Sequence, residues 1–458
     1  MGLWLAVVFA KFGTPVIFGE LIDPPRTLLE FLLNPWPINW GYFMFGAAAF
    51  FTLPGWKWKP TPPTWIVILP LVWFGWQLLS ARRTIDGRLT QQTLVDFAAC
   101  TLCFYVGAFS LSRSRNCSPI WWGLSLGLLF CLWAGLNQHF GGIEETRRYL
   151  QTLNWDLYPP QFKAKMSSPE FQQKISSNRI WGTFIYPNAL AGGIILALPA
   201  SLVALWNLGL RFPFVSRGVL VGTAAYIGIA CLVWSGSKAG WLIMLLMMLV
   251  VFFHLEQISN RMKWTAIMLL MIIGLGGFYG KYSGYFARRT NSATARLDYW
   301  QAGWEMLKEK PFFGSGPGTF MIGYQRLKRP KSESAKLAHN DYLQQGSDSG
   351  IVGLGSYFAL VAGSIAVLYR RMRPTEDWMR FAVWLGVAGL AAQELVEFSL
   401  YIPALAWPFF LFLGWLWGGA GGAVGCLPPR PNIEIQSTIN PSSPKLPSHN
   451  EDSISERA

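Results

Sequence analysis

Charged residues and histidine are scarce in this sequence. Only 14% of the 458 residues are charged and only four are histidine, whereas a typical soluble domain is about one quarter charged. Hydrophobic residues make up 52% of the chain, which also contains 24 tryptophans. Apolar stretches of roughly 17–25 residues recur, which is the length a helix needs to cross a bilayer. The composition excludes an ordinary soluble protein and predicts an all-α polytopic membrane protein.

The sequence also lacks the patterns of several common sites. The glycine-rich string KPFFGSGPGTF (310–320) has no GK[ST] ending and no surrounding β-α unit, which excludes a nucleotide-binding loop and favours turns beside the membrane. No group of His, Asp and Glu has the spacing of metal ligands. We therefore expect neither a metal nor another cofactor. No internal repeat is visible, which argues against the inverted repeats of many transporters.

The apolar stretches predict twelve membrane-spanning helices in one transmembrane domain, residues 1–426. Part of the net charge of +14 lies in alternate short loops, which is a topology signal and does not indicate nucleic-acid binding. If these loops are cytoplasmic, both termini are inside, and Arg82, Arg83 and Arg88 are an exception on the outer side. The predicted spans are about 3–20, 39–53, 64–80, 94–112, 119–139, 184–209, 219–235, 239–254, 263–281, 350–369, 380–397 and 400–426.

This orientation places two long hydrophilic segments outside, at about 140–183 and 282–349. Their basic residues could attract anionic lipid headgroups or a phosphate-bearing substrate. The residues after the last span, 427–458, are rich in Pro, Ser and Asn. We expect them to form a disordered cytoplasmic tail.

The positions of the four histidines make one of them a candidate catalytic residue. His449 lies in the tail, His254 ends a span on the predicted cytoplasmic side, and His139 ends a span on the outer side, where it is a weak candidate. His339 lies at the end of the larger outer segment, immediately before a span and beside Asn340. A histidine in such a loop is often structural, but its position also suits a proton acceptor.

Three glycines follow His339 at intervals close to the helical period. In a helix that starts at His339, Gly346, Gly350 and Gly353 lie within about 40° of the histidine direction. Such a stripe lets a neighbouring helix or a lipid chain approach closely. The glycines therefore either pack helices together or form a groove beneath the histidine.

Cations near the predicted outer surface are candidates for anion binding. Lys238 lies in WSGSKAGW between two spans with almost no loop, so it either snorkels or binds an anion. Arg179 precedes a span, and Arg296 taken alone is typical of a solvated loop. Glu394 and Glu397 lie in an apolar segment, where acidic groups face a cavity or pair with cations such as these arginines.

Four segments in order resemble the O-antigen ligase family of bacterial membrane glycan transferases, over about residues 175–405. His339-Asn340 followed by Gly350 and Gly353 resembles its histidine motif, and SGSKAGW its Ser-Arg-Gly turn. Lys238 stands where the family usually has arginine, so the charge is kept but bidentate geometry is lost. The other two segments are RIWGTFIYPNALAG and ARLDYWQAGWEMLKEKPFFGSGPGTF.

The resemblance implies a lipid-dependent, GT-C-like glycosyltransferase with large periplasmic segments. It would transfer a glycan from an undecaprenyl-diphosphate carrier to a hydroxyl acceptor, of the lipid A-core type or similar, at the periplasmic face of the bacterial inner membrane and without a metal. His339 would be the general base. Arg296 and Lys238, together with Arg179, would bind the diphosphate. Supporting roles fall to Asn188, Asn340, Gly346, Gly350 and Gly353.

Three alternatives to a glycan ligase are open at this point. A glycan polymerase would use another lipid-linked glycan as the acceptor, and a protein O-oligosaccharyltransferase would use a protein. A twelve-span secondary transporter would use the same Arg, Lys and Glu residues for substrate coupling. In the transferase alternatives, the partners are the lipid-linked donor, a lipid, glycan or protein acceptor, and membrane lipids, with no nucleic acid.

Overall fold

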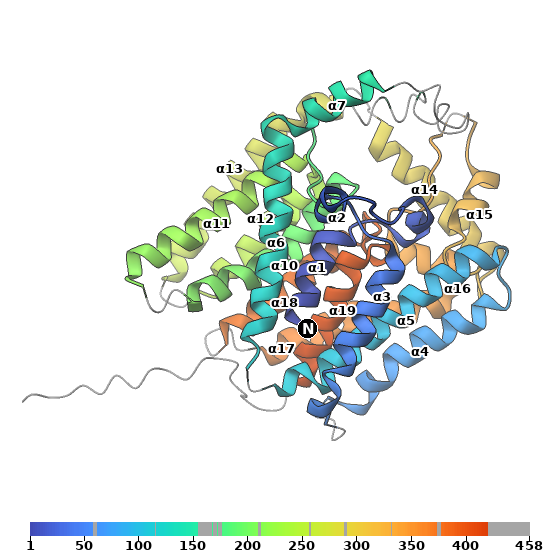
Figure 1. Cartoon of the computed structure of the whole chain (residues 1–458), viewed down its shortest axis with the longest axis horizontal. Helices are drawn as coiled ribbons and strands as arrows, with labels where there is room; N and C mark the ends of the chain where they lie inside the picture. Colours follow the sequence, from blue (N-terminus) through green and yellow to red (C-terminus); the bar gives the residue numbers. More distant parts are fainter. Residues whose placement is uncertain are drawn as a thin grey trace, which may run out of the picture. The chain divides into compact units, whose positions relative to one another are not determined.

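The apolar runs of the sequence form helices throughout the part of the chain that the computed structural model describes (Figure 1). The described residues are 1–57, 62–114, 116–153, 167, 172, 176–208, 212–255, 258–287, 291–330, 332–372 and 377–419, without the side chains of 20–21, 282–287 and 291–293. The predicted tail 427–458 lies outside them, as does most of 154–175. Within these ranges there is no strand, only an isolated bridge between Gly13 and Phe184.

Each of the twelve predicted spans overlaps a helix among the described residues, but the first, 3–20, contains α1 and a separate 3-10 helix (Val16–Leu21), and the last, 400–426, extends beyond those residues. In the described residues, seven helical segments are long and apolar enough to cross a membrane, and α1, α12 and α19 are shorter apolar helices. The prediction of an all-α polytopic membrane protein is confirmed. The helices are α1 (Gly2–Lys11), α3 (Ile38–Phe50), α4 (Thr64–Ala81), α5 (Gly87–Phe109), α6 (Ser118–Asn137), α10 (Pro187–Leu208), α11 (Phe214–Ser235), α12 (Lys238–Phe253), α13 (Asn260–Ala287), α16 (Asp341–Phe358) with α17 (Ser364–Arg371), α18 (Trp378–Gln393) and α19 (Pro403–Gly418).

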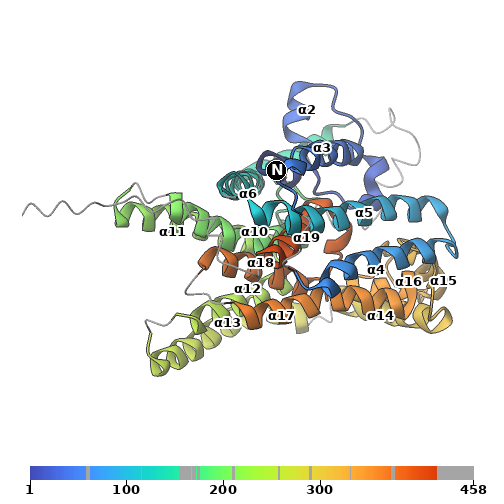
Figure 2. The same ribbon diagram turned by 90° about the horizontal axis from the view of Figure 1, so that it is seen from below.

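The helix α19 lies at the centre of the packed core. All of its residues are buried, and it packs along α5, where a side chain at Gly107 would collide with the backbone of Leu411. Gly414 makes the reciprocal close approach to Phe104. Glycine therefore allows the two backbones to meet. Figure 2 shows α10 and α18 beside α19, with α11 and α13 at the periphery.

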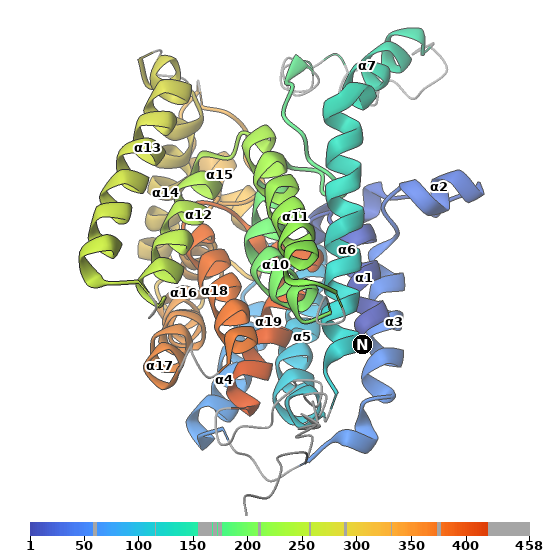
Figure 3. The ribbon, with the colours of Figure 1, turned by 90° about the vertical axis from the view of Figure 1, so that its left-hand side faces the viewer.

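The larger predicted outer segment contains two further helices, α14 (Asn291–Glu309) and α15 (Phe320–Leu327). Buried residues on α14 recur every three or four positions, which is the helical period, and they pack against α15 in a small core of their own. The smaller segment begins with α7 (Ile143–Thr152). Figure 3 shows α7 and the end of α13 that leads to α14 on the same side of the helices, as the predicted loop arrangement requires.

The helix expected to begin at His339 begins at Asp341 instead, so the predicted glycine stripe beneath the histidine is wrong. His339 has a positive φ of 49°, and Asn340 caps α16 by accepting a hydrogen bond from the Leu343 N–H at 2.9 Å. The helix is broken again at Gly350, where φ is 74° and ψ is −171°. Neither residue therefore has the helical geometry that the stripe requires.

Two of these glycines, Gly346 and Gly350, instead accommodate neighbouring parts of the same outer segment. The break at Gly350 lets the Ile351 N–H donate to Pro311 O at 2.7 Å, and a Cβ on Gly350 would meet the Phe312 carbonyl oxygen at 2.1 Å. Gly346 faces Leu307 of α14, while a Cβ on Gly353 would collide with a side chain of its own helix. These positions serve packing and not a lipid groove below His339.

Candidate functional site

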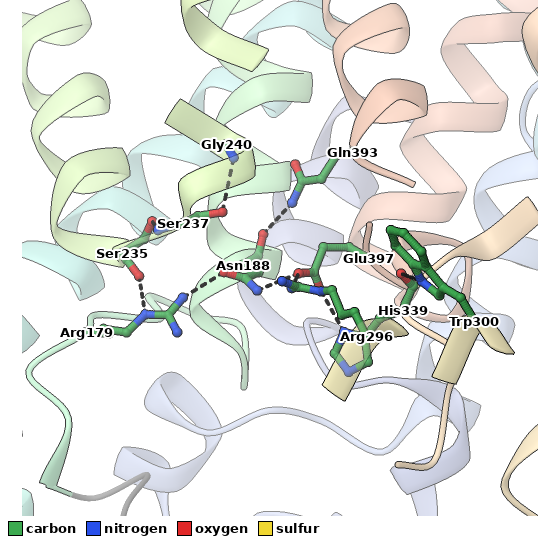
Figure 4. Close-up of polar contacts among 10 residues, drawn as sticks. All are labelled: Arg179, Asn188, Ser235, Ser237, Gly240, Arg296, Trp300, His339, Gln393 and Glu397. Atoms are coloured by element: carbon green, nitrogen blue, oxygen red, sulfur yellow. Dashed lines mark hydrogen bonds and ion pairs between the residues drawn. The ribbon is translucent and has the colours of Figure 1, made fainter. Parts of the chain in front are cut away.

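The carboxylate of Glu397 contacts three of the residues selected from the sequence (Figure 4). Its Oε1 accepts hydrogen bonds from Asn188 Nδ2 at 2.5 Å and from the Arg296 guanidinium, and its Oε2 lies 3.2 Å from His339 Nδ1. Arg179 joins through Asn188. Together, Arg179, Asn188, Arg296, His339 and Glu397 form what we name the Glu397 cluster.

Glu397 lies in the connection between α18 and α19, not inside a helix. It is 5% exposed, whereas the side chains of Arg296 and His339 are 25% and 27% exposed. The cluster therefore has a buried anion beneath two cationic or basic groups that solvent reaches. This arrangement lets the upper groups meet a substrate while the carboxylate holds them in place.

The backbone of His339 is strained. It is the one non-glycine residue with positive φ in the described part of the chain, a conformation that costs about 1–3 kcal/mol. Its carbonyl accepts a hydrogen bond from Trp300 Nε1 at 3.3 Å. Its ring stacks on Tyr299 with centroids 5.7 Å apart and meets Phe398 edge-on at 4.7 Å. These contacts fix an orientation that the local backbone does not prefer.

Asn188, in the first turn of α10, connects the two arginines of the cluster. Its Oδ1 accepts from Arg179 at 2.7 Å, while its Nδ2 donates to Glu397 as described. Arg179 also donates to Ser235 O at 2.7 Å. The following residue, Gly236, has a left-handed φ of 64°, and a Cβ there would lie 3.0 Å from Arg179 Nε. Glycine at 236 is therefore what allows this close approach.

Lys238 brings a third positive charge to this site. It is the first residue of α12, directly after the capping Ser237, which accepts a hydrogen bond from the Gly240 N–H at 3.2 Å. Its ammonium lies within electrostatic range of both Arg179 and Arg296. The N-terminus of α12 adds the positive end of a helix dipole. Three cationic side chains thus lie close together among the described residues, which suits a phosphate-bearing ligand.

The charge state of Glu397 follows from its partners. Burial alone would raise its pKa, but the hydrogen bond from His339 and the charge of Arg296 outweigh burial and hold the pKa below the ordinary glutamate value. Glu397 is therefore a carboxylate at neutral pH. A carboxylate beside Nδ1 of His339 favours the tautomer that carries its proton there, which leaves Nε2 as a proton acceptor.

Comparison with known protein families identifies one match to this chain. Residues 223–358 match the family model described as O-Antigen ligase. This part of the chain is similar to the O-antigen ligase family. No curated protein matches the sequence. The match supports a glycan transferase of the ligase or polymerase type over a secondary transporter.

The part matched by the O-antigen ligase model contains Lys238, Arg296 and His339, whereas Arg179 and Glu397 lie outside it. Asn188, which the sequence analysis named as a supporting residue, lies between Arg179 and Glu397 and bonds to both. Asn340, in contrast, caps a helix. The predicted supporting glycines belong to the packing of α16, as described above.

The sequence predicted that Glu397 either faces a cavity or pairs with a cation. Its predicted pairing with an arginine is confirmed, but its contact with His339 was missed. Glu394 differs from that prediction, because its carboxylate accepts a hydrogen bond from the Tyr357 hydroxyl at 2.9 Å. The weak candidate His139 stacks on Trp234 with centroids 3.8 Å apart. No group of three His, Cys, Asp or Glu residues that could hold a metal occurs among the described residues.

Proposed function

We propose that this protein transfers a glycan from an undecaprenyl-diphosphate carrier to a hydroxyl of a lipid A-core type acceptor, at the periplasmic face of the bacterial inner membrane. The observation that supports it most directly is the 3.2 Å contact between His339 Nδ1 and Glu397 Oε2. The same carboxylate is bonded to Arg296 and, through Asn188, is linked to Arg179. A proton acceptor and anion-binding groups are thus held by one network.

In the proposed reaction, Nε2 of His339 removes the proton of the acceptor hydroxyl as its oxygen attacks the anomeric carbon of the glycan. Glu397 holds the ring and stabilises the imidazolium that forms. The bond from the anomeric carbon to the phosphate oxygen breaks, and undecaprenyl diphosphate leaves with the electron pair. The new glycosidic bond replaces the one that is broken.

Arg296 and Lys238 are placed to stabilise the negative charge on the departing diphosphate. The Arg296 guanidinium has five N–H groups, of which one Nη donates to Glu397, so further donors can meet phosphate oxygens. Lys238 supplies a point charge at the start of α12. Arg179, held by Asn188 and Ser235, extends the positive surface. Such preorganised charge stabilises a transition state in a partly dry site.

The decisive variant is His339→Ala. We expect glycan transfer to fall about 10²- to 10⁴-fold, with normal membrane insertion and normal binding of the lipid-linked donor. The assay uses purified protein in proteoliposomes with the lipid-linked donor and the lipid acceptor, and gel mobility of the acceptor as the readout. His139→Ala is the matched control, because this exposed histidine stacks on Trp234 and is not a member of the Glu397 cluster. Full transfer by His339→Ala would end the general-base hypothesis.

A deletion strain separates the ligase from its alternatives. Long glycan chains stranded on the carrier would support the ligase. Single repeat units on the acceptor would identify a polymerase instead, and unmodified glycoproteins would identify a protein O-oligosaccharyltransferase. Complementation with the His339→Ala variant should leave whichever phenotype occurs uncorrected.

A further inference from the structure

Asp341 is completely buried, two residues after His339, and it is bonded to both sides of the segment that contains Glu397. Its N–H donates to Glu394 O at 2.8 Å, and its Oδ2 accepts from the Leu400 N–H at 2.9 Å. Glu397 lies between these two attachment points in the chain. The start of α16 and the connection between α18 and α19 are therefore joined through one residue, by its main-chain N–H on one side of Glu397 and by its side chain on the other.

Two tyrosines join the same helices at positions further from the site. The Tyr342 hydroxyl donates to Ala391 O at 3.2 Å, and the Tyr357 hydroxyl donates to the Glu394 carboxylate at 2.9 Å. Both bonds hold α16 against the end of α18. Asp341 instead reaches beyond Glu397 to the backbone of Leu400, directly beside the site, whereas the bonds of Gln345 and Asp348 to the Tyr401 hydroxyl lie further along α16.

The burial of Asp341 is costly, which indicates a specific role. The residue is 0% exposed, and among the described residues its Oδ1 has no hydrogen-bond partner. A buried polar atom without a partner destabilises the folded state. The bond from Oδ2 to the Leu400 N–H is what this carboxyl provides and an apolar side chain of similar size would not.

We propose that Asp341 is a positioning residue that sets the distance between His339 Nδ1 and Glu397 Oε2. His339 lies two residues before Asp341 and has a strained backbone conformation. Glu397 lies in the connection between α18 and α19, which Asp341 bonds. A displacement of about 1 Å between catalytic groups can lower a rate about 10²-fold. This inference rests on the proposed function, because it assigns Asp341 to the same proton transfer.

Three variants test this role through the kcat and KM of glycan transfer. Asp341→Leu removes the acceptor, and we expect kcat to fall about 10²-fold. The KM for the donor should change less than about threefold, because Arg179 and Lys238 are held by other elements. Asp341→Asn keeps an oxygen for the Leu400 N–H and should retain kcat within about threefold. Tyr342→Phe, the control, removes a bond between the same helices without touching the connection and should also keep kcat.

The same comparison separates positioning from acid–base chemistry and from stability. If Asp341→Asn loses as much kcat as Asp341→Leu, Asp341 acts through its charge and the inference is overturned. In a His339→Ala background, Asp341→Leu should cause no further loss, because the two residues act on one step. Full additivity in that double variant would instead indicate a general structural role and would also overturn the inference.

Two further outcomes keep the test decisive. If Asp341→Leu does not fold, Asp341→Ser is measured with the same expectation, since serine suits the start of a helix but its hydroxyl is shorter. A wild-type protein without transfer activity would refute the proposed function itself. Wild-type activity with an unchanged kcat in the folded leucine or serine variant would refute only the role of Asp341.

Discussion

Two polar clusters lie along α16, and they differ in charge and exposure. The Glu397 cluster lies beside its start and contains ionised groups that solvent reaches. The second, which we name the Asp348 cluster, is fully buried and contains one carboxyl group among amides, a hydroxyl and an indole. Its members are Trp73, Gln77, Gln344, Gln345, Asp348 and Tyr401.

The bonds of the Asp348 cluster join separate parts of the fold. Asp348 Oδ2 accepts from the Gly318 N–H at 2.9 Å and from the Tyr401 hydroxyl at 3.2 Å. Gln345 Oε1 accepts from Trp73 Nε1 and Gln77 Nε2, each at 2.9 Å. This network of buried residues ties α4, α16, the connection between α18 and α19 and the glycine-rich turn together.

The comparison shows which features distinguish a functional polar cluster from a structural one in this chain. Both clusters are held by hydrogen bonds, so bonding alone does not distinguish them. The Glu397 cluster combines two arginines, a strained His339 and solvent access, which are features of a binding and reacting site. The Asp348 cluster has none of these in the described residues and has the properties of a structural network.

The largest expected effect separates two glutamates that lie three residues apart. Glu397→Gln replaces the acceptor beside His339 Nδ1 with a group that no longer favours the required tautomer, so we expect transfer to fall about 10²- to 10⁴-fold. Glu394→Gln keeps an oxygen for the Tyr357 hydroxyl and should retain activity within about threefold. Measuring kcat for both variants tests the comparison directly. Equal losses would show that the two carboxylates do not differ in function.

Lys238 gives the next largest effect. We expect Lys238→Met to lower transfer and donor affinity by about tenfold or more, because it removes one charge that meets the diphosphate. Lys238→Arg should preserve both, since the charge remains and arginine forms bidentate bonds to phosphate. Binding of lipid-linked donor to proteoliposomes is the measurement. If the methionine and arginine variants are equally active, the lysine only snorkels.

The sequence predicted the fold better than the site because the two depend on different information. Long apolar runs determine the spans locally, so their positions agree with the observed helices. The contact of His339 with Glu397 joins residues 58 positions apart, and that of Asn188 with Glu397 joins residues 209 apart. Periodicity within one helix carries no information about such contacts.

Local backbone geometry explains the remaining errors. The stripe prediction assumed a continuous helix, whereas His339 and Gly350 both have positive φ. A histidine gives no sequence signal for that conformation, and Gly350 is compatible with either a helix or a break. The motif resemblance selected the histidine that contacts Glu397, because it depends on residue identity and not on the assumed helix.

A change in the Asp348 cluster should lower stability more than catalysis. Asp348→Leu leaves the Gly318 N–H and the Tyr401 hydroxyl without their acceptor, at a cost of about 1–3 kcal/mol for each unsatisfied buried group. We expect a lower midpoint of thermal unfolding in detergent and a kcat per folded molecule within about threefold of wild type. Asp348→Asn, which keeps an oxygen, should unfold closer to wild type. If kcat fell while the midpoint of thermal unfolding stayed at the wild-type value, Asp348 would belong functionally with the Glu397 cluster.

The smallest effect is expected where the glycine-rich turn meets α4. Trp76 Nε1 donates to Ser349 O at 2.7 Å, and its ring stacks on Phe313 with centroids 5.2 Å apart and planes 9° from parallel. Trp76→Phe keeps an aromatic ring but removes the hydrogen bond, which is worth about 0.5–1.5 kcal/mol. Thermal unfolding should show a small decrease, and glycan transfer should be unchanged. A large loss of transfer would show that the position of this turn affects the Glu397 cluster, and the two polar regions would then be coupled through α16.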